Sequence, residues 1–581
     1  MAKLKINGQQ ICVPDNSTIM EAADEVGIHI PRLCYLKGIN EIGACRVCLV
    51  EVAGMEKLVP ACDTQVREGM EVITNSPRLR KVRRTNVELL LSDHKSECTS
   101  CVRSGNCSLQ TIANDLGIIR KEFEFNTAEK NRWDNRFPLI RDASKCIKCM
   151  RCIQVCEKIQ GLGIWDLCGT GHRTTIGVKN NKSFQDVDCA LCGQCITHCP
   201  VGALRERDDR DVLNDALADP ETVVIAQIAP AVRTAWAEQI GLPNDENTTG
   251  KLVCALKEIG IDYVFDTNYA ADLTIMEEGS EFLERLSHRD EYAWPMFTSC
   301  CPGWLRFIKT QYPNMLKHLS TAKSPQQMFG AMSKTYIAHK LGVNPDKVFS
   351  VSIMPCVAKK YERTVPQVNH EPDKYDVDLV LTTRELARFI RSDSIKPEDL
   401  SNLPFDDIFG EGTGAGAIFG TTGGVMEAAL RSAYYLVRGE NPEPDAFKDV
   451  RGDKGWREQT FSLNGTELKV AVVHGLANAR AMMEAVRKGE VEYDFVEVMA
   501  CPGGCVGGGG QPFKDGEERA AGRSEKLYDI DRNSKIRFSH ENSAVLLTYE
   551  EFLEKPLSNT AHHLLHTNVK NWDIEIVRED T

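Results

Sequence analysis

The sequence has no excess of basic residues and no long hydrophobic run. Its 70 lysines and arginines are outnumbered by 83 aspartates and glutamates, which gives a formal net charge of -13. Without a basic stripe to neutralise phosphates, a nucleic-acid partner is disfavoured. No apolar stretch approaches the roughly 20 residues of a membrane-spanning helix, and the opening MAKLKINGQQ resembles neither an export signal nor a twin-arginine leader. We therefore expect a soluble cytoplasmic protein with no membrane span.

A dinucleotide-binding signature is also missing. The glycine-rich stretch GAGAIFGTTGG, residues 414–424, lacks the G-x-G-x-x-G frame that follows a strand in such sites. No flavin motif is visible either. The chain is therefore not expected to bind a nucleotide itself.

Cysteine, by contrast, is abundant. The 581 residues are too many for one hydrophobic core, so several domains are expected. The chain has 23 cysteines, most of them in the first 200 residues. Disulfides do not persist in a reducing compartment, where thiolates serve more often as metal ligands or catalysts. The chain thus divides into a cysteine-dense N-terminal part and a long C-terminal part of ordinary composition.

The first cysteine group follows a predicted strand, turn, strand and helix in LKINGQQICVPDNSTIMEAADEVGI, with the helix beginning after Asn16 or Ser17. Four thiolates then follow on a loop and the adjoining strands, which is enough to hold a two-iron cluster. A structural zinc site is the alternative, because zinc knuckles also use a C-x-x-C pair. Cys12 is interpreted as a small buried residue. The candidate ligands are Cys34, Cys45, Cys48 and Cys62.

A second group lies in SDHKSECTSCVRSGNC. Three sulfurs and one imidazole suit zinc as well as iron, and this segment alone does not decide between them. The order of a two-iron segment followed by H-x3-C-x2-C-x5-C resembles the large iron-sulfur subunit of respiratory NADH dehydrogenase, which implies a four-iron cluster. The candidate ligands are His94, Cys98, Cys101 and Cys107.

The clearest signal is a pair of runs, CIKCMRCIQVC and CALCGQCITHCP. Each is C-x2-C-x2-C-x3-C, the bacterial two-cluster ferredoxin pattern, in which the fourth cysteine of each run binds the other cluster. Cys168 has no partner in this scheme and is interpreted as structural. One predicted four-iron site comprises Cys146, Cys149, Cys152 and Cys199, and the other comprises Cys156, Cys189, Cys192 and Cys195.

After an acidic helical linker, ALRERDDRDVLNDALADPE, the pattern changes. Short β-branched runs alternate with helix-like stretches, which predicts largely parallel sheets covered by helices. Most of the remaining cysteines stand at the ends of such runs, where open α/β sheets bind their ligands. The predicted strands lie in TVVIAQIAPAV, KVFSVSIMPC, DVDLVLTT, LKVAVVHG and YDFVEVMAC.

The segments TSCCPGW, MPCVAKK and EVMACPGGCVGGGGQP resemble the three signatures of the iron-only, or [FeFe], hydrogenases, in the same order. The resemblance extends over nearly the whole chain, including FDTNYAADLTIMEEGSE, AKSPQQMFG and GAGAIFGTTGGVMEAALRSA. It implies an H-cluster, a four-iron cluster that shares Cys505 with a two-iron unit bearing carbon monoxide, cyanide and an azadithiolate. The implied ligands are Cys301, Cys356, Cys501 and Cys505.

The resemblance also implies residues around the two-iron unit. Lys359 matches a lysine beside a cyanide ligand, where it acts as a charge-assisted donor; a surface lysine is the alternative. Ala231 stands where some members carry a serine that can donate to a cyanide, so one donor is absent here. The implied cofactor-binding residues are Met354, Met499, Pro230, Ala231 and Gln326.

A proton relay is implied as well. Cys300 matches a free thiol beside the two-iron unit, and a thiol with an ordinary pKa near ~8.5 exchanges protons at neutral pH. Glu278, Glu281 and Arg285 share one helical face at i, i+3 and i+7. The implied order is Cys300, Glu278, Ser320 and Glu281, with Arg285 alongside. An ordinary solvated face is the alternative interpretation.

Two further features are interpreted without a functional role. His562 and His566 in AHHLLHT have a metal-like i, i+4 spacing, but a capped amphipathic helix is the favoured interpretation. Cys254 in KLVCALKEIG is placed in the core.

The sequence thus predicts a multidomain α+β and α/β protein. We expect a β-grasp [2Fe-2S] ferredoxin-like domain over residues 1–78, a one-histidine, three-cysteine [4Fe-4S] segment over 79–136, a two-[4Fe-4S] ferredoxin domain over 137–215 and an H-cluster domain over 216–581. The implied activity is reversible oxidation of H2, with electrons passing to ferredoxin or to NAD(P)H- and flavin-binding partner subunits. A stand-alone ferredoxin-linked enzyme and a non-catalytic sensory or assembly protein are the alternatives.

Overall fold

A computed structural model of the chain describes residues 1–581 except 121, 125–132, 244–247, 411, 515–516 and 578–581. The N-terminal region forms a mixed five-stranded sheet in the order β2-β1-β5-β3-β4, with one helix beside it. Its elements are β1 (Ala2–Ile6), β2 (Gln9–Val13), α1 (Ile19–Glu25), β3 (Leu49–Val52), β4 (Val59–Pro60) and β5 (Glu71–Ile73). The side chain of Thr18, one residue later than predicted, caps the helix by accepting from the Glu21 amide.

The prediction that Cys12 is buried is wrong. Cys12 is exposed, whereas its neighbours Ile11 and Val13 point into the N-terminal core. Side chains alternate between the two faces of a strand, so Cys12 necessarily lies on the outer face of β2.

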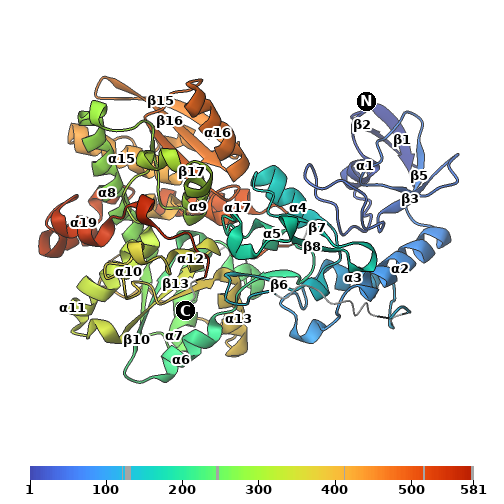
Figure 1. Cartoon of the computed structure of the whole chain (residues 1–581), viewed down its shortest axis with the longest axis horizontal. Helices are drawn as coiled ribbons and strands as arrows, with labels where there is room; N and C mark the ends of the chain where they lie inside the picture. The colour runs from blue at the N-terminus through green and yellow to red at the C-terminus, as the bar shows by residue number, and fades with distance from the viewer. Residues whose placement is uncertain (121, 125–132, 244–247, 411, 515–516, 578–581) are drawn as a thin grey trace.

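The second cysteine-rich region joins this sheet to the rest of the chain. Two helices, a small ferredoxin-like unit with two short two-stranded sheets and the linker helix follow in order, and in Figure 1 this unit lies between the N-terminal sheet and the large C-terminal body. The elements are α2 (Pro77–Ser92), α3 (Ser108–Asp115), β6 (Leu139–Arg141), α4 (Arg151–Gln154), β7 (Trp165–Cys168), β8 (Thr175–Val178), α5 (Gln194–Thr197), β9 (Leu204–Glu206) and α6 (Arg210–Ala218).

Two four-stranded sheets form the C-terminal body, as the alternating pattern predicts. The first, in the order β11-β10-β13-β14, is entirely parallel. The second, in the order β12-β17-β16-β15, is parallel except for its edge strand β15. The strands are β10 (Val223–Ile228), β11 (Tyr263–Asp266), β12 (Met296–Phe297), β13 (Val348–Met354), β14 (Leu379–Thr382), β15 (Trp456–Leu463), β16 (Thr466–His474) and β17 (Phe495–Met499).

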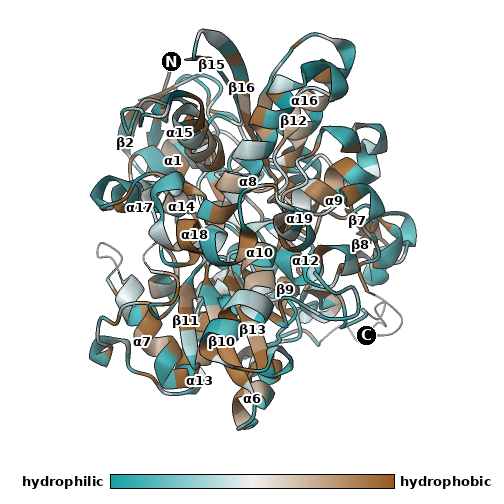
Figure 2. Ribbon diagram, turned by 90° about the vertical axis from the view of Figure 1, so that its left-hand side faces the viewer, coloured by the Kyte–Doolittle hydropathy of each residue, from teal (hydrophilic) through white to brown (hydrophobic). Residues whose placement is uncertain are grey.

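The five predicted strands are therefore present as β10, β13, β14, β16 and β17. Strands β10, β13 and β14 are buried on both faces, and β10, β11 and β13 are mostly hydrophobic in Figure 2. The strand β15 was not predicted, because it lies at an edge and its residues are largely polar and exposed. The strand β12 has only two residues and gives no periodic signal.

Helices cover the faces of both sheets. The long helix α8 (Thr267–Ser287) packs against α10, α14 and α15, so most of its residues are buried. The remaining helices are α7 (Thr249–Ile259), α9 (Pro302–Gln311), α10 (Pro325–Met332), α11 (Ala338–Leu341), α12 (Ala358–Glu362), α13 (Thr383–Ser392), α14 (Gly414–Ile418), α15 (Gly424–Arg438), α16 (Leu476–Lys488), α17 (Ala520–Asn533), α18 (Ser543–Thr548) and α19 (Asn559–Leu565).

The C-terminal helices run back over this body. The helix α17 packs on α14, and α19 packs on α10 at the outer edge of the molecule (Figure 1). In the part of the chain that the structure describes, every helix is too short or too polar to cross a bilayer.

Candidate functional site

The four cysteines of the N-terminal region converge. The thiols of Cys45 and Cys62 flank that of Cys34 and lower its pKa to about 2. The thiol of Cys62 also flanks that of Cys48 and lowers the pKa of Cys48. All four side chains are buried. A group of four thiols this close together fits a metal cluster, which binds thiolates.

His94 is held in one orientation. It is buried, and its Nδ1 atom lies 2.8 Å from the carbonyl oxygen of Lys145, so Nδ1 carries the hydrogen. The Cys107 thiol lies 3.8 Å from the carbonyl oxygen of Pro200. A Cβ atom on Gly202 would lie 2.7 Å from Cys101 Sγ. This segment therefore packs directly on the ferredoxin-like unit.

The two ferredoxin-type runs have the same backbone conformation. In each run, the residues just before and just after the second cysteine are left-handed. They are Lys148 and Met150 in the first run, with φ of 56° and 64°, and Leu191 and Gly193 in the second, with φ of 54° and 72°. Left-handed φ is unusual outside glycine. The repeated conformation bends the backbone of each run around its second cysteine.

The cysteines gather across the two runs. Cys149 and Cys152 lie near both Cys146 and Cys199, and Cys192 and Cys195 lie near Cys189 and Cys156. Each set therefore draws its fourth cysteine from the other run. Cys168, outside both sets, is buried on β7 and its thiol donates to the Val178 carbonyl oxygen.

The cysteine sites contact one another through their loops. The Asn40 amide donates to the carbonyl oxygens of Cys34 and Cys149 at 2.6 and 3.0 Å. On the other side, the Gln194 amide donates to the Gly507 carbonyl oxygen at 2.8 Å, and the Cys501 thiol lies 3.8 Å from the Cys192 carbonyl oxygen. Two distal sites, the four cysteines of the N-terminal region and the segment of His94, thus border the half of the ferredoxin-like unit that contains Cys149. The loop after β17 borders the half that contains Cys192.

A buried cavity of about 80 Å³ lies where the parallel strands end. The loops after β10, β12, β13 and β17 converge there, as expected for the carboxyl edge of open α/β sheets. Apolar side chains supply much of the lining, so a charged or metallic group in the cavity would be shielded from water. The predicted residues that line it are Pro230, Ala231, Cys300, Cys301, Gln326, Met354, Cys356, Lys359, Met499, Cys501 and Cys505.

The glycine-rich loop after β17 leaves no room for side chains. A Cβ atom on Gly508 would lie 2.2 Å from the Pro355 carbonyl oxygen, and one on Gly509 would lie 2.2 Å from the Cys192 carbonyl oxygen. Gly504 has φ of +88°. These glycines let the loop approach two other backbones closely, which places Cys501 and Cys505 at the cavity.

Lys359 is buried, so the alternative interpretation as a surface lysine is wrong. Its ammonium group lies 2.7 Å from a carboxylate oxygen of Glu362 and donates to the Cys300 carbonyl oxygen at 3.2 Å. Burial opposes the charge, but the Glu362 carboxylate outweighs it and the pKa of Lys359 is raised. The cavity therefore has one fixed positive charge in its wall.

The predicted relay residues Glu278, Ser320, Glu281 and Arg285 are also buried rather than solvated. Ser320 donates to Glu281 at 2.8 Å, and Arg285 donates to the same carboxylate. Neither carboxyl oxygen of Glu278 has a hydrogen-bond partner among the described residues. Burial raises the pKa of Glu278 to about 8, and the Glu281 carboxylate adds to this rise. Burial likewise raises the pKa of the Cys300 thiol, next to Glu278.

Several residues in the cavity wall or behind it were missed from the sequence. Glu362 stands three residues after Lys359, and this i, i+3 spacing of opposite charges could have indicated the pair. Thr267 and Phe419 line the cavity but carry no local signal. Glu497 is buried on β17 and accepts from the amides of Gly423 and Met426, at the start of α15.

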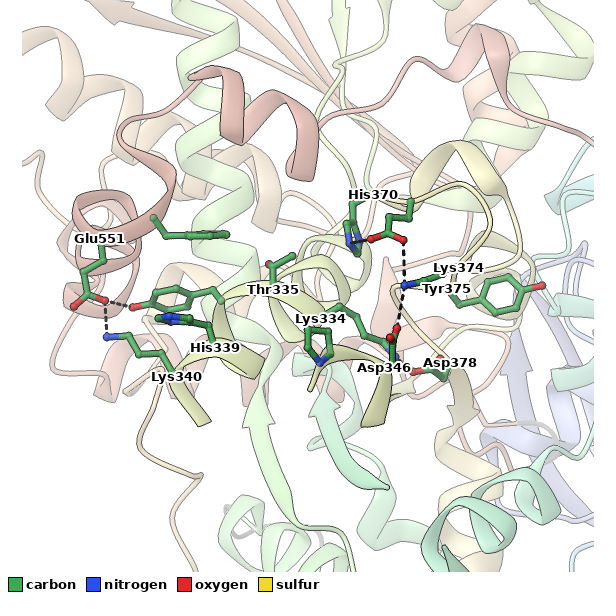
Figure 3. Close-up of a pocket in the computed structure, with 14 residues that line it drawn as sticks. Lys334, Thr335, His339, Lys340, Asp346, His370, Lys374, Tyr375, Asp378 and Glu551 are labelled. Carbon is green, nitrogen blue, oxygen red and sulfur yellow. Dashed lines mark hydrogen bonds and ion pairs between the residues drawn. The ribbon is translucent and has the colours of Figure 1, made fainter. Parts of the chain in front are cut away.

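A larger groove of about 1030 Å³ lies at the other end of β13 (Figure 3). Its three lysines are paired with carboxylates: Lys334 with Asp378, Lys340 with Glu551, and Lys374 with Asp346. The groove adjoins the start of β13, whereas open sheets bind ligands where strands end. The buried cavity is therefore the stronger candidate site.

Comparison with known families covers most of the chain. Residues 222–509 match the C-terminal domain of the iron only hydrogenase large subunit, and residues 517–572 match the iron hydrogenase small subunit. Residues 1–77 match a 2Fe-2S iron-sulfur cluster binding domain. Residues 83–121 match the NADH-ubiquinone oxidoreductase-G iron-sulfur binding region, and 138–205 match the ferredoxin-like domain of NADH-quinone oxidoreductase subunit 3. The resemblance to NADH dehydrogenase is thus confirmed, whereas the small-subunit region was not separated in the sequence.

The chain belongs to the iron-only, or [FeFe], hydrogenase family, and it is a hydrogenase with iron-sulfur domains at its N-terminal side. It is 46% identical to the NADP-reducing hydrogenase subunit HndD of Solidesulfovibrio fructosivorans, over 98% of both chains. It is 40% identical to iron hydrogenase 1 of Clostridium pasteurianum, over 98% of this chain and 100% of that one.

A solved structure supports the same relationship. An apo [FeFe]-hydrogenase variant from Chlamydomonas reinhardtii superposes with a TM-score of 0.55 and is 40% identical. The match covers 61% of this chain and 98% of that one. The matched part is therefore about as long as the C-terminal body, and shorter than the whole chain.

Proposed function

We propose that the buried cavity holds an H-cluster and that this chain interconverts H2 with two protons and two electrons there. The observation that carries the proposal is the convergence of five cysteine thiols and a buried ammonium group on one water-shielded cavity, with the buried Glu278 carboxyl next to the Cys300 thiol. The four thiolates that would hold the four-iron part belong to Cys301, Cys356, Cys501 and Cys505.

The cluster would supply an open iron site with a nearby amine base, at which H2 is split or formed. The chain's own residues bind and orient it. Lys359 faces the cavity with its charge fixed by Glu362 and provides a donor for an anionic ligand. Met354 and Met499 fill the wall with adaptable apolar side chains. Gln326 donates to Glu362 and accepts from Ser352, which fixes its place in the wall.

The protons need a path through the protein. Cys300 would exchange a proton with Glu278, whose raised pKa keeps the carboxyl protonated at neutral pH. Ser320 links this side to Glu281 through its hydroxyl group. Arg285 donates to Glu281 and would orient this carboxylate.

The N-terminal cysteines would hold one [2Fe-2S] cluster and three [4Fe-4S] clusters, one of them with His94 as a ligand. We propose the four domains with the boundaries predicted above, the first of them a β-grasp domain. Both distal sites border the site of Cys146, Cys149, Cys152 and Cys199. A redox partner therefore has two separate places at which to exchange electrons with the same ferredoxin-like unit.

We further propose that the partner is an NAD(P)H- and flavin-binding protein in a multisubunit complex, with ferredoxin as a second partner. The similarity to an NADP-reducing hydrogenase subunit supports this, because the chain itself carries no dinucleotide signature. Purification from native extract tests it. A lone chain that reduces ferredoxin but never NAD(P), even in the extract, would overturn the complex.

The test of the activity is direct. Protein matured and purified without oxygen should evolve H2 from a reduced dye and consume H2 with an oxidised one, and its infrared spectrum should contain carbonyl and cyanide bands. A sensory or assembly protein would contain iron but would neither evolve nor consume H2. That result would contradict the proposed catalytic role.

A further inference from the structure

A buried hydrogen-bonded chain links α8 to the C-terminal segment and takes no part in the proposed relay. Glu277 is fully buried and accepts from the Tyr549 hydroxyl at 2.6 Å and the Leu557 amide at 2.9 Å. His566 Nε2 lies 2.9 Å from the same carboxylate. An ionised carboxylate only accepts hydrogen bonds, so Nε2 carries a hydrogen.

The other ring nitrogen of His566 contacts the segment beside the relay. Nδ1 lies 2.8 Å from Thr321 Oγ1, and in the neutral ring it accepts the hydroxyl hydrogen. His566 is not part of α19: its backbone is extended, and it forms an antiparallel β-bridge with Ala322. His562 lies in α19 and His566 lies just after it, so their i, i+4 spacing is not that of two residues in one helix. The centres of the two rings nevertheless lie 4.5 Å apart.

Thr321 in turn contacts the outer carboxylate of the relay. Its amide hydrogen is shared between the two oxygens of Glu281, at 3.2 and 3.0 Å. Its carbonyl oxygen accepts from the Thr567 amide at 2.8 Å. The preceding residue, Ser320, donates to Glu281 through its hydroxyl. Thr321 is thus fixed by Glu281 on one side and by the 566–567 segment on the other.

We propose that His566, oriented by Glu277, is a positioning residue that holds Thr321 against Glu281 and so sets the geometry at the outer end of the proton relay. This inference rests on the proposed relay through Glu281. Arg285 and Ser320 complete the contacts to that carboxylate, and the Thr321 amide is the contact that the C-terminal segment controls.

The titratable groups around His566 come from several elements. They are Glu277 of α8, Tyr549 after α18, His562 of α19 and Lys323, whose ammonium donates to the Leu564 carbonyl oxygen.

Residues 517–572, which include His566, match the small-subunit family. The inference therefore gives this C-terminal region a role in proton transfer as well as in covering the catalytic body.

Two substitutions separate the two hydrogen bonds of His566. The side-chain oxygen of asparagine takes the place of Nδ1, so His566→Asn keeps an acceptor for Thr321. The amide nitrogen of glutamine takes the place of Nε2, so His566→Gln keeps the donor to Glu277 and loses Thr321. Thr321→Val removes the hydroxyl but keeps the amide that faces Glu281. His563→Gln, on an exposed position of α19, is the matched control.

The experiment measures H2 evolution against pH, with its solvent isotope effect, in fully matured full-length protein. We expect His566→Gln and Thr321→Val each to slow turnover roughly two- to tenfold, the range for one lost hydrogen bond. The pH profile of turnover should also change, because displacement of Thr321 alters the contact of its amide with the outer carboxylate of the relay. The double variant should be no slower than either single one, since both remove the same contact. His566→Asn should retain most of the activity.

Two controls make the outcomes distinct. Iron content and melting temperature report on folding, and Glu281→Gln reports on the relay itself. If Glu281→Gln leaves turnover unchanged, the relay is wrong and this inference is overturned with it. If Glu281→Gln is slow but His566→Gln and Thr321→Val match His563→Gln in rate and pH profile, only this inference is overturned. Equal losses in His566→Asn and His566→Gln with an unchanged pH profile would assign His566 to packing alone.

Discussion

The Lys359 ammonium lies 2.7 Å from the Glu362 carboxylate in a site where both side chains are buried. A charge in such a site depends on its partner, because burial without a counter-ion is costly. Ser324 and Gln326 also donate to Glu362, so the carboxylate is held from several sides. The positive charge of Lys359 in the cavity wall therefore depends on Glu362, which does not itself line the cavity.

Removal of this counter-ion should destabilise the protein. We expect Glu362→Ala to lower the free energy of unfolding by about 3 to 5 kcal/mol, the usual cost of breaking a buried ion pair. Denaturant unfolding of the iron-loaded protein measures it. Glu371→Ala is the control, because its pair with Lys374 is exposed and should contribute less than about 1 kcal/mol. Equal losses in the two variants would show that Glu362 is not needed to balance Lys359.

Cys300 and its neighbour should respond differently to substitution. Cys300→Ala removes the titratable thiol beside Glu278 and should slow turnover at least about 100-fold, as for a lost general acid–base group. Its iron content should stay unchanged. Cys301→Ala should instead lower the iron content, because this thiol is a proposed ligand. Unchanged turnover in Cys300→Ala would remove Cys300 from the mechanism.

The raised pKa of Glu278 predicts a pH dependence of turnover. With a pKa of about 8, the carboxyl carries its proton at neutral pH and loses it as the pH rises through 8. H2 evolution, which needs a protonated donor, should therefore decline across this range. Glu278→Gln should be slow at every pH and should lack this step. A wild-type profile that is flat from about pH 7 to 9 would contradict the assignment.

The same shift predicts a dependence of stability on pH. The folded-state pKa of Glu278 lies above its ordinary value of 4.5, so the folded protein binds the proton more tightly than the unfolded chain. The stability from this group is complete below about pH 4.5 and is lost as the pH rises toward 8. Glu278→Gln should therefore flatten the decline of the melting temperature between about pH 5 and 8. An unchanged slope would show that the carboxyl ionises normally.

Arg384 connects the ferredoxin-like unit to the glycine-rich loop after β17. It pairs with buried Glu206 at 2.6 Å and donates to the carbonyl oxygens of Gly509 and Gln511, both at 2.7 Å. Burial of Glu206 is outweighed by Arg384 and Arg388, which hold its pKa well below the usual range.

Arg384→Met should therefore lower the free energy of unfolding by about 3 kcal/mol or more, because it leaves buried acceptors unpaired. Thermal unfolding of the iron-loaded protein measures this. Arg391→Met, at an exposed position of the same helix, should stay within about 0.5 kcal/mol of the wild type. A melting temperature of Arg384→Met equal to that of the control would show that the link carries no stability.

The sequence was most informative where a local pattern determines the structure. Five strands of the two sheets follow from β-branched runs, and the two ferredoxin-type cysteine runs follow from their spacing, whereas the cysteines at the cavity were indicated by the resemblance to the hydrogenase family. Contacts between distant segments were not predictable in this way. The residues Glu277 and His566 lie 289 positions apart, yet share a hydrogen bond. Glu278 and Glu281 could be placed on one face, but their burial depends on the helices that pack around α8. Cys12 was misplaced because one strand position does not reveal which face is inner.

The close approach of Gly193 and Gly509 has a consequence for engineering. The Gly509 Cα lies 2.9 Å from where a Cβ on Gly193 would be, so neither position admits any other residue without movement of the other loop. The ferredoxin-like unit is consequently not freely exchangeable. A foreign ferredoxin unit joined to this C-terminal body would have to carry glycine at this point, or the two loops would be pushed apart on the proposed electron path.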